Sequence, residues 1–507
     1  MCGIAGFCNF NENFEENTDY WNFRLEKMRA VLAHRGNDAR GRFLKKHIGL
    51  SHSRLAIRDI LCGDQPMTRT HNGYDYTICY NGEIYNTDEL IPELSENGFV
   101  CSTTSDTEVI LYAYIHWGAD FVSRLNGIFA FAIWDAAKNR LLLYRDRVGV
   151  KPLFYAIRGD SLVFGSEPKA CFAHPAVKPE LDKQGLQELL AIGPAHTSGL
   201  SLFKDLFEVL PGHFIIYSRD GLHDETYWEL TSREHTDSYQ DTVAHTRFLV
   251  EDAIKRQMVS DVPVCTFLSG GIDSSIVTAI AANYMNTRGK TLNTFSFDFK
   301  DNDKYFKANA FQPERDLPYV NRMLEEYETA HSYLECDENA LFKALFAAVD
   351  AKDMPGMTDV DSSLLYFCSL VSRKNKVALT GECADEIFGG YPWFYRKELL
   401  ERYGFPWSSD VAPRLALLRD DVGLELDLSG YQAFRYEESR SKAPLLYGEA
   451  GEDESRRIIG YLNIKWFMQT LLDRMDRTSM YSELEARVPF ADHRIIEYVF
   501  NVPWHMK

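Results

Sequence analysis

Short apolar segments, interrupted by glycine, asparagine and aspartate, dominate the first 215 residues. Two of the interruptions, residues 136–139 and 158–160, have the composition of tight turns, so we predict hairpins there. Residues 106–117 place apolar side chains at helical spacing behind a candidate capping residue, which predicts a helix. This half is expected to be rich in antiparallel strands, with helices between them. The strand candidates are residues 76–86, 127–147, 152–167 and 213–223.

A polar, acidic stretch at 224–241 nearly lacks aliphatic side chains and indicates a linker. We predict a first domain over residues 1–215, a linker over 216–240 and a second domain over 241–507. Beyond the linker, strand-like segments alternate with helix-like ones, which predicts a doubly wound, mostly parallel sheet with helices on both faces. Residues 403–455 are less regular, and we expect added helices and loops there. The strand candidates of this half are residues 262–268, 292–299 and 376–380.

The composition narrows the class of protein without changing this architecture. With 45% hydrophobic and 25% charged residues among 507, the chain is typical of a soluble globular protein of two or three domains. A net charge of −19 disfavours a nucleic-acid partner held by a basic surface. The sequence has no apolar run of membrane-spanning length and no signal-peptide pattern. Its ten cysteines form no CxxC pair, so we expect neither a disulfide framework nor a zinc cluster, and a reducing cytoplasm fits best.

Candidate chemistry begins at the second residue. Removal of Met1, which the small neighbouring residues permit, would leave Cys2 as the N-terminus. A free α-amino group has a pKa of roughly 8, so it can act as the base for the thiol of its own residue. The alternative is a buried N-terminal thiol without a role.

A set of motifs decides between these alternatives. They occur in one order within the first domain: CGIAGF at 2–7, HRG at 34–36, SHSRLAI at 51–57, NGEIYN at 81–86, TSDTE at 104–108, RDRVGVKPLFY at 145–155 and FGSEPKA at 164–170. Together they resemble the class II glutamine amidotransferase domain. The resemblance implies an Ntn-type αββα sandwich of antiparallel sheets, with Cys2 as the nucleophile that attacks the glutamine amide.

The same resemblance assigns the remaining residues of a glutamine site. Asn81 and Gly82 would form the oxyanion hole, and Asn81 also contacts the substrate. The roles are chemically sensible because an arginine fork matches a carboxylate and acidic groups suit an ammonium. Taken alone, Asn81 and Gly82 read more simply as a hairpin turn. The substrate contacts implied are Arg54 for the glutamine α-carboxylate, and Glu83 and Asp106 for its α-ammonium group.

The second domain carries a glycine-rich loop, SGGIDSS at 269–275, between a predicted strand and a predicted helix. Backbone N–H groups and a helix N-terminus can hold phosphate in such a loop. The pattern resembles the pyrophosphate loop of ATP pyrophosphatases, which cleave ATP between its α and β phosphates. In that setting an aspartate within the loop is suited to Mg²⁺.

Further motifs extend the match, and with the first domain the chain resembles the glutamine-dependent asparagine synthetases. These motifs are TFSFDF at 294–299, MPGMTDVDSS at 354–363, TGECADEIFGGY at 380–391 and LLDRMDRTSMYSELEARVPFAD at 471–492. The resemblance implies adenylation of aspartate by ATP and attack on β-aspartyl-AMP by ammonia released at Cys2. Glu382 would act as the acid/base, and Asp273 and Asp385 would bind Mg²⁺. The implied ATP contacts are Leu268, Ser269, Gly270, Gly271, Asp273, Ser274, Phe297, Thr380 and Gly381.

Several departures from the family pattern affect these expectations. HRGND replaces the usual HRGPD, PFAD replaces PFLD, and MPGMTDVDSS replaces a Thr-Thr-x-Arg segment that some members carry near the aspartate site. The family also carries a Lys-x-x-Leu-Arg segment some tens of residues after the PFLD motif, whereas this sequence stops fifteen residues past Asp492. We therefore expect a C-terminally truncated version of a longer enzyme, with glutaminase activity retained and synthetase activity impaired.

Two other functions remain open at this point. A related amidotransferase could adenylate a different carboxylate, and aspartate-dependent pyrophosphate release would separate it from an asparagine synthetase. A regulatory protein could bind glutamine or ATP without turnover. The partners expected are glutamine, aspartate and ATP, with a homodimer implied by family resemblance only.

Overall fold

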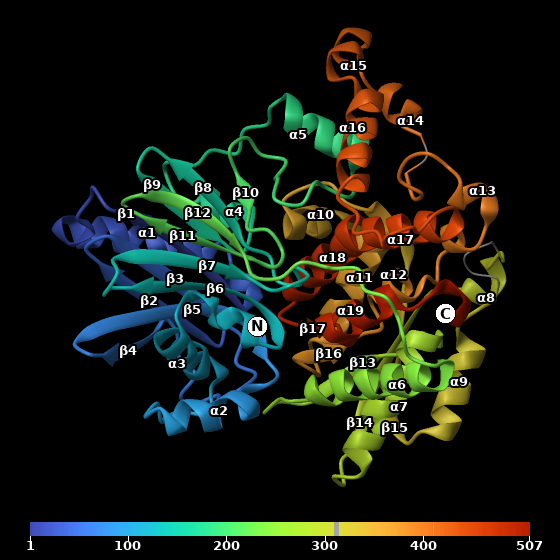
Figure 1. The fold of residues 1–507 in the computed structure, drawn as a ribbon, viewed down its shortest axis with the longest axis horizontal. Helices are drawn as coiled ribbons and strands as arrows, with labels where there is room; N and C mark the ends of the chain where they lie inside the picture. Colours follow the sequence, from blue (N-terminus) through green and yellow to red (C-terminus); the bar gives the residue numbers. More distant parts are fainter. Residues whose placement is uncertain (309–313, 409) are drawn as a thin grey trace.

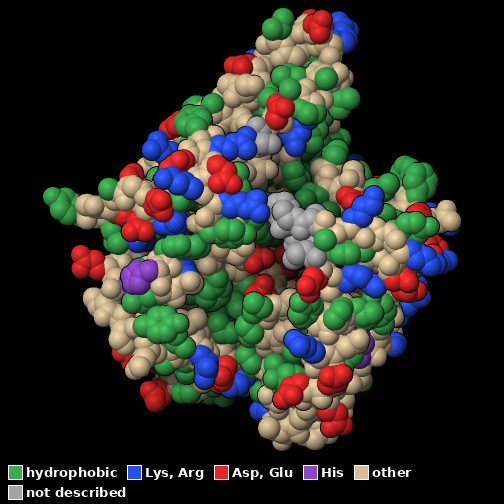
Figure 2. Space-filling view, turned by 90° about the vertical axis from the view of Figure 1, so that its right-hand side faces the viewer, with side chains coloured by type: hydrophobic (Ala, Val, Ile, Leu, Met, Phe, Trp, Pro, Cys, Tyr) green, Lys and Arg blue, Asp and Glu red, His purple; other side chains and the backbone are tan. Residues whose placement is uncertain are grey.

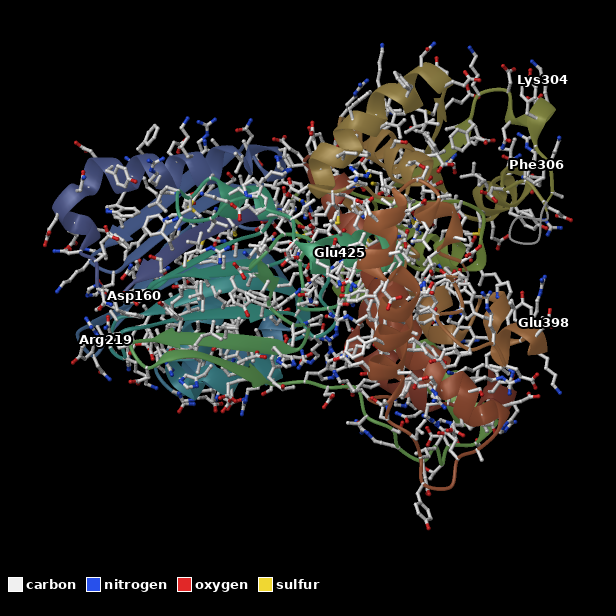
Figure 3. The ribbon with its side chains drawn as sticks, turned by 90° about the horizontal axis from the view of Figure 1, so that it is seen from above. Asp160, Arg219, Lys304, Phe306, Glu398 and Glu425 are labelled. Atoms are coloured by element: carbon white, nitrogen blue, oxygen red, sulfur yellow. The ribbon has the colours of Figure 1, made fainter. Side chains whose placement is uncertain are left out.

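The computed structural model describes residues 1–308, 314–408 and 410–507, and it forms two halves that lie side by side (Figure 1). The first half contains two antiparallel sheets, and the second contains one parallel sheet. Figure 3, seen from above, shows the same division: Asp160 and Arg219 lie at the outer end of the first half, and Lys304 and Glu398 lie at the outer end of the second.

The first sheet of the N-terminal half places β1, which carries Cys2, between two neighbours. Its strand order is β10-β8-β9-β1-β3-β2. Cys2 lies opposite Arg54 in the register of β1 and β3, so the strand pairing alone brings these two predicted site residues together. The strands are β1 (Cys2–Asn9), β2 (Ala39–Lys45), β3 (Ile48–Arg54), β8 (Phe154–Arg158), β9 (Ser161–Gly165) and β10 (Phe207–Glu208).

The second sheet packs face to face on the first, in the order β12-β11-β7-β6-β5-β4. Apolar side chains such as Ile4, Leu50, Cys79 and Ala130 fill the space between the two sheets. The predicted hairpins at 136–139 and 158–160 are confirmed as the β6–β7 and β8–β9 connections. The strands are β4 (Met67–His71), β5 (Tyr74–Ile84), β6 (Gly127–Asp135), β7 (Arg140–Arg145), β11 (His213–Ser218) and β12 (Gly221–Thr226).

Helices cover the outer face of each sheet and complete the predicted αββα sandwich. α1 and α4 share an apolar core with the first sheet, and α2 and α3 share another with the second. The helix expected at 106–117 is confirmed as α3, with Ser105 as its N-cap. The helices are α1 (Thr18–Ala30), α2 (Thr87–Glu96), α3 (Asp106–Trp117), α4 (Pro168–Phe172) and α5 (Lys183–Gln187).

The C-terminal half is built on a parallel sheet of order β15-β14-β13-β16-β17, as the alternation of strands and helices predicts. Successive side chains of a strand point to opposite faces, so Val264 joins the core under α6 and α7 while Cys265 joins the core beside α11. Both faces are therefore buried. The strands are β13 (Val264–Phe267), β14 (Leu292–Phe299), β15 (Thr329–Cys336), β16 (Val377–Leu379) and β17 (Glu485–Arg487).

The helices of this half include a projecting group, α14 to α16, at the top of Figure 1. Within the described ranges, no helix is both long and apolar enough to cross a bilayer. The helices are α6 (Tyr239–Arg256), α7 (Ile272–Asn286), α8 (Asn302–Tyr305), α9 (Leu317–Glu326), α10 (Glu338–Lys352), α11 (Thr358–Val371), α12 (Ala384–Phe388), α13 (Lys397–Leu400), α14 (Ala412–Leu415), α15 (Asp420–Leu426), α16 (Leu428–Arg440), α17 (Glu452–Leu462), α18 (Met468–Met480) and α19 (His493–Asn501).

The boundary between the halves requires a correction. The linker was expected over 216–240, but β11 and β12 extend the second sheet to Thr226, and α6 begins at Tyr239. The chain between them, 227–238, contains neither strand nor helix. The predicted boundary at 215/216 falls within β11 because the polar residues of β12 line an exposed edge strand, where a polar sequence resembles a linker.

Candidate active sites

Cys2 begins β1, with only 8% of the residue exposed, beside the junction of the two halves. Its backbone N–H donates to Asn81 Oδ1 at 2.9 Å, and its carbonyl accepts from Arg35 Nε at 3.1 Å. Burial raises the pKa of the thiol, and the nearby N-terminal amine opposes that rise. The thiol is therefore fixed in position and depends on a neighbouring base for its activation.

Asn81 supplies a buried hydrogen-bond donor that has no acceptor among the described residues. Its side chain is 0% exposed, and its Oδ1 is occupied by the Cys2 N–H, but its Nδ2 is unpartnered. A buried unsatisfied amide is costly in an ordinary core, so it suits a place where negative charge develops on a ligand. Gly82 follows it in a tight position, because a Cβ there would lie 2.2 Å from the carbonyl oxygen of Ile128. Both residues lie within β5, so the alternative of a hairpin turn is wrong.

Arg54 ends β3 with its guanidinium group held by the loop that follows. Nη2 donates to the carbonyl of Asp59 at 2.6 Å, and Nη1 lies 2.9 Å from Asp64 Oδ1. The side chain of Arg54 is 6% exposed, whereas that of Asp64 is 79% exposed. The guanidinium group of Arg54 thus already pairs with one carboxylate, that of Asp64. Because Asp64 is exposed, its side chain can move away if a ligand carboxylate takes its place.

Glu83 and Asp106 form a buried acidic pair near the end of β5. Tyr80 Oη and the Ile84 N–H both donate to Asp106 Oδ2, at 2.8 and 3.0 Å. Burial and the charge of Asp106 raise the pKa of Glu83 to about 8, against the opposing effects of Arg487 and Arg58. An additional cation is favoured between two such acids, as expected for the ammonium group of an amino acid.

The predicted nucleotide-binding segment, 268–274, follows β13 and includes the first three residues of α7. Leu268 is buried, and its N–H donates to Phe295 O at 2.8 Å, which fixes the start of the loop. Ser269 and Ser274 close the loop through their hydroxyl groups, 3.0 Å apart. Gly270 has φ +85°, and a Cβ there would lie 2.8 Å from Tyr319, so this position requires glycine. Gly271 is exposed at the N-cap of α7, where backbone N–H groups are available to an anion.

A second loop, which follows β16, lies against the first. A Cβ on Gly381 would be 2.8 Å from the backbone nitrogen of Ser274, so the two loops touch. Thr380 is buried, and its N–H donates to the carbonyl of Arg487 at 3.0 Å. Burial raises the pKa of Asp273 to about 6, and the charges of Asp385 and Glu382 add to the rise. The three predicted acids therefore share one region of the structure.

This acidic region fits Mg²⁺, although no cluster of three or more ligand side chains occurs among the described residues. Mg²⁺ in phosphoryl-transfer sites is commonly held by one or two carboxylates together with substrate phosphates. Besides burial, the charges of Asp385 and Glu382 raise the pKa of Asp273, and Glu382 also raises that of Asp385, so a cation would relieve repulsion among these carboxylates. Figure 2 shows a hollow in the face that lies at the right-hand side of Figure 1, with acidic side chains beside it.

Phe297, another predicted ATP contact, packs against aromatic side chains. It lies on β14, beside the strand that leads into the loop, and its ring centroid is 5.3 Å from that of Phe367. At the HRGND departure, Asn37 is exposed and accepts a hydrogen bond from Arg40 at 3.3 Å, while the next residue, Asp38, donates its backbone N–H to the carbonyl of Arg54 at 2.9 Å.

Three arginines at these sites were missed in the sequence. Arg58 binds Glu83 at 3.0 Å, Arg474 binds Glu382 at 3.2 Å, and Arg487 lies 3.5 Å from Glu83. Arg58 follows Arg54 by four residues, and the other two lie within the motif at 471–492. A charged side chain inside an apolar motif is a usable signal, since such a residue is rarely buried without a partner.

Buried ion pairs join the two halves between these sites. Arg35 binds Asp476 of α18 at 2.8 Å, and Lys151 binds the same carboxylate at 2.9 Å. The amine of Met1 lies 2.9 Å from Glu485 of β17. Every side chain in these pairs is at most 1% exposed. Separation of the halves would leave buried charges unpaired, so their relative position is strongly specified.

Comparison with known families agrees with this arrangement. Residues 1–228 match the family model described as a glutamine amidotransferase domain, and residues 245–507 match the one described as asparagine synthase. The chain is 49% identical to "Asparagine synthetase [glutamine-hydrolyzing] 3" of Bacillus subtilis, over 100% of this chain and 82% of that protein.

Two more distant relatives differ in their described activity. "Asparagine synthetase [glutamine-hydrolyzing] 1" of Bacillus subtilis is 29% identical over 100% of this chain and 82% of that protein. "Amidase chyE" of Penicillium rubens is 30% identical over 100% of this chain and 83% of its own length.

Proposed function

The chain belongs to the family of glutamine-hydrolysing asparagine synthetases, and from this premise we propose that it forms asparagine from aspartate, glutamine and ATP. One observation carries the proposal furthest: both sites contact the same short strand, β17. Arg487 of this strand lies 3.5 Å from Glu83 of the proposed glutamine pocket, and its carbonyl accepts from Thr380 of the adenylation loop. Two half-reactions that share ammonia require sites in such a fixed relation.

In the first half-reaction, the Cys2 thiolate attacks the side-chain amide carbon of glutamine. Once Met1 is removed, the α-amino group of Cys2 takes the thiol proton and returns a proton to the leaving ammonia. Asn81 Nδ2 and the Gly82 N–H donate to the oxyanion that forms. Arg54 holds the α-carboxylate of glutamine, while Glu83 and Asp106 hold its ammonium group. Water then hydrolyses the thioester to glutamate.

In the second half-reaction, the β-carboxylate of aspartate attacks the α-phosphorus of ATP and pyrophosphate leaves. The resulting β-aspartyl-AMP is attacked by ammonia, and the product amide forms as AMP departs. Backbone groups of the loop at 268–274 hold the phosphates, and Thr380 and Gly381 fix the neighbouring loop. Asp273 and Asp385 would hold Mg²⁺, which neutralises phosphate charge when bound. Glu382, oriented by Arg474, takes the proton from the attacking ammonia.

We also propose a cytoplasmic enzyme that forms a homodimer. All ten cysteines are free thiols in the structure, in keeping with a reducing compartment. The homodimer rests on family resemblance and is testable by sedimentation.

The proposal is tested by pyrophosphate release with Mg²⁺, ATP and glutamine, comparing aspartate, glutamate and no acceptor, on this chain and on one extended through the Lys-x-x-Leu-Arg segment that the family carries. We expect aspartate to raise the rate above both other conditions. Equal rates in all three, with glutamine hydrolysis intact, would contradict the choice of acceptor. The amidase relative and the unusual segment at 354–363 favour a second candidate, an amidotransferase that adenylates a different carboxylate, and that result would support it.

A further inference from the structure

The strand β17 belongs to the synthetase half but directs two side chains at the glutaminase half. Residues two apart on a strand share a face, so Glu485 and Arg487 point the same way. Glu485 reaches the N-terminal amine, and Arg487 reaches Glu83 of the proposed glutamine pocket. Both side chains are almost fully buried, at 1% and 0% exposed.

Three short hydrogen bonds hold the guanidinium group of Arg487 within its own half. Nε donates to Glu485 at 2.5 Å, and Nη1 donates to the carbonyls of Gln257 and Val259 at 2.5 Å each. These carbonyls follow the end of α6, so the group is anchored to its own half. The fourth contact, from Nη2 to Glu83 Oε2, is longer at 3.5 Å. This contact crosses the junction, and the distance between Nη2 and Oε2 is long enough to decrease when the charge on Glu83 increases.

The backbone of the same residue contacts the adenylation loop. Arg487 pairs with Leu379 in the parallel register of β16 and β17. Its carbonyl accepts from the Thr380 N–H at 3.0 Å and from the Thr380 hydroxyl at 3.4 Å. Thr380 Oγ1 in turn accepts from the Glu382 N–H at 3.4 Å. A displacement of Arg487 is therefore passed to Thr380 and Glu382 through two hydrogen bonds.

Charge on Glu83 is the variable that Arg487 would sense. Burial and the neighbouring charge of Asp106 raise the pKa of Glu83, so the empty pocket favours the protonated form of this carboxyl more than water does. A ligand ammonium favours the charged carboxylate, which attracts the Arg487 cation more strongly. The groups that set this charge, from every element packed around it, are Asp106, Arg58, Arg487, Glu485, Tyr80 and Tyr85.

We propose that Arg487 is a positioning residue that couples occupation of the glutamine pocket to the geometry of the loop Thr380–Gly381–Glu382. The proposal rests on the proposed function, since it takes glutamine and ATP as the two ligands. It assigns Arg487 no contact with either ligand. Glutamine in its pocket and ATP at its loop should therefore each strengthen the binding of the other, by the same factor.

The test measures this factor by calorimetry, with Cys2→Ala as the background so that glutamine is bound and not hydrolysed. ATP affinity is measured with Mg²⁺, with and without saturating glutamine. We expect glutamine to tighten ATP binding by about 5-fold or more, and R487K to reduce this factor to about 1 while each ligand alone binds within about 3-fold of the background. R477K is the matched control, because Arg477 is equally buried at the junction but binds Glu167 and Asp353.

Each result has one meaning. A coupling factor unchanged by R487K, or lost equally in R477K, would overturn the role of Arg487. A factor of about 1 in the Cys2→Ala background itself would overturn the coupling. If ATP fails to bind at all, the proposed function fails as well, and the calorimeter shows this before glutamine is added.

The pH dependence of glutamine affinity provides a further test, because a purely structural role of Arg487 would not change it. Arg487 lowers the pKa of Glu83, so R487Q should raise that pKa further. Glutamine affinity should then rise with pH over a range displaced upward relative to the Cys2→Ala background, whereas R487K, which keeps the charge, should leave the range in place. Superimposable profiles in R487Q and the background would contradict the proposal. If R487Q fails to fold, R487K still decides the matter by the coupling factor.

Discussion

The two proposed sites of this molecule differ in their exposure to solvent. The glutamine site is closed: Cys2, Arg54, Asn81, Glu83 and Asp106 are each at most 8% exposed, and every one is held by strand pairing or by a buried partner. The nucleotide site is open. It borders a groove of about 900 Å³ that includes Asp273, Asp385 and Ile272, and Ile272 is 78% exposed.

This difference fits the chemistry that we propose for each site. An uncharged amide must be polarised, and a few donors achieve this only where water is excluded. A nucleoside triphosphate brings its own charge, so its site needs backbone dipoles, carboxylates for a metal ion and room for a large ligand. We therefore expect activity at the closed site to depend on single atoms, and activity at the open site to depend on net charge. Substitutions at each site test this contrast.

Cys2→Ala should have the largest effect, because it removes the bond-forming atom of the closed site. We expect glutamine hydrolysis to fall by at least about 10⁴-fold, while ammonia-dependent pyrophosphate release stays within about 2-fold. The two rates are measured as glutamate and pyrophosphate formation. Cys62→Ser, at an exposed thiol, serves as the control. Residual hydrolysis above about 1% would show that another group is the nucleophile.

Asp273→Asn should have the next largest effect, and on the open site alone. Loss of one metal-binding charge should lower pyrophosphate release by about 10²-fold and raise the Mg²⁺ concentration required. Glutamine hydrolysis measured without ATP should be unchanged. Asp301→Asn is a suitable control because Asp301 is on the same half, in a left-handed conformation that asparagine also adopts. Equal losses in both activities would indicate that Asp273 is structural.

Arg54→Lys should weaken glutamine use by about 30-fold in kcat/KM, because a lysine cannot match a carboxylate with two parallel hydrogen bonds. The loss should appear mainly in KM. Asp64→Asn provides the opposite change: it removes the carboxylate that now pairs with Arg54, so KM should fall or stay constant. A higher KM in Asp64→Asn would show that Asp64 supports the pocket and does not compete with the substrate.

His52→Gln should give the smallest effect, seen in stability and not in catalysis. His52 is buried in β3, and burial lowers its pKa to about 3. The unfolded chain binds a proton near pH 6.5 and the folded chain does not, so stability falls as pH drops below 6.5. The substitution should remove about 2 kcal/mol of this acid destabilisation at pH 5. Urea unfolding at pH 7 and pH 5 measures it, and parallel losses in both proteins would contradict the assignment.

The same contrast explains what the sequence could and could not predict. The parallel sheet and its loop were predictable because strand, glycine-rich turn and helix are local patterns, and β14 has the bounds expected for it. The residues of the proposed glutamine site are predicted from motif resemblance, and the pairing of β1 with β3 places Cys2 opposite Arg54.

What escaped prediction depends on long-range contacts. Arg487 and Glu83 are 404 positions apart, and no local pattern indicates that they meet. The polar strand β12 lies within the predicted linker. As an exposed edge strand, it lacks the alternation of buried and exposed positions that would indicate a strand. Contacts across the junction are fixed by the packing of two domains, which the local sequence does not encode.

Whether the two sites work as one enzyme can be measured from the origin of the nitrogen in the product. Glutamine labelled with ¹⁵N in its side-chain amide is supplied together with an equal concentration of unlabelled ammonium, and asparagine is analysed by mass spectrometry. The account predicts that the asparagine formed carries mostly ¹⁵N, since nitrogen released at Cys2 passes across the junction without mixing with solvent. Asparagine with the isotope ratio of the bulk ammonium pool would contradict the claim that the two sites work as one enzyme.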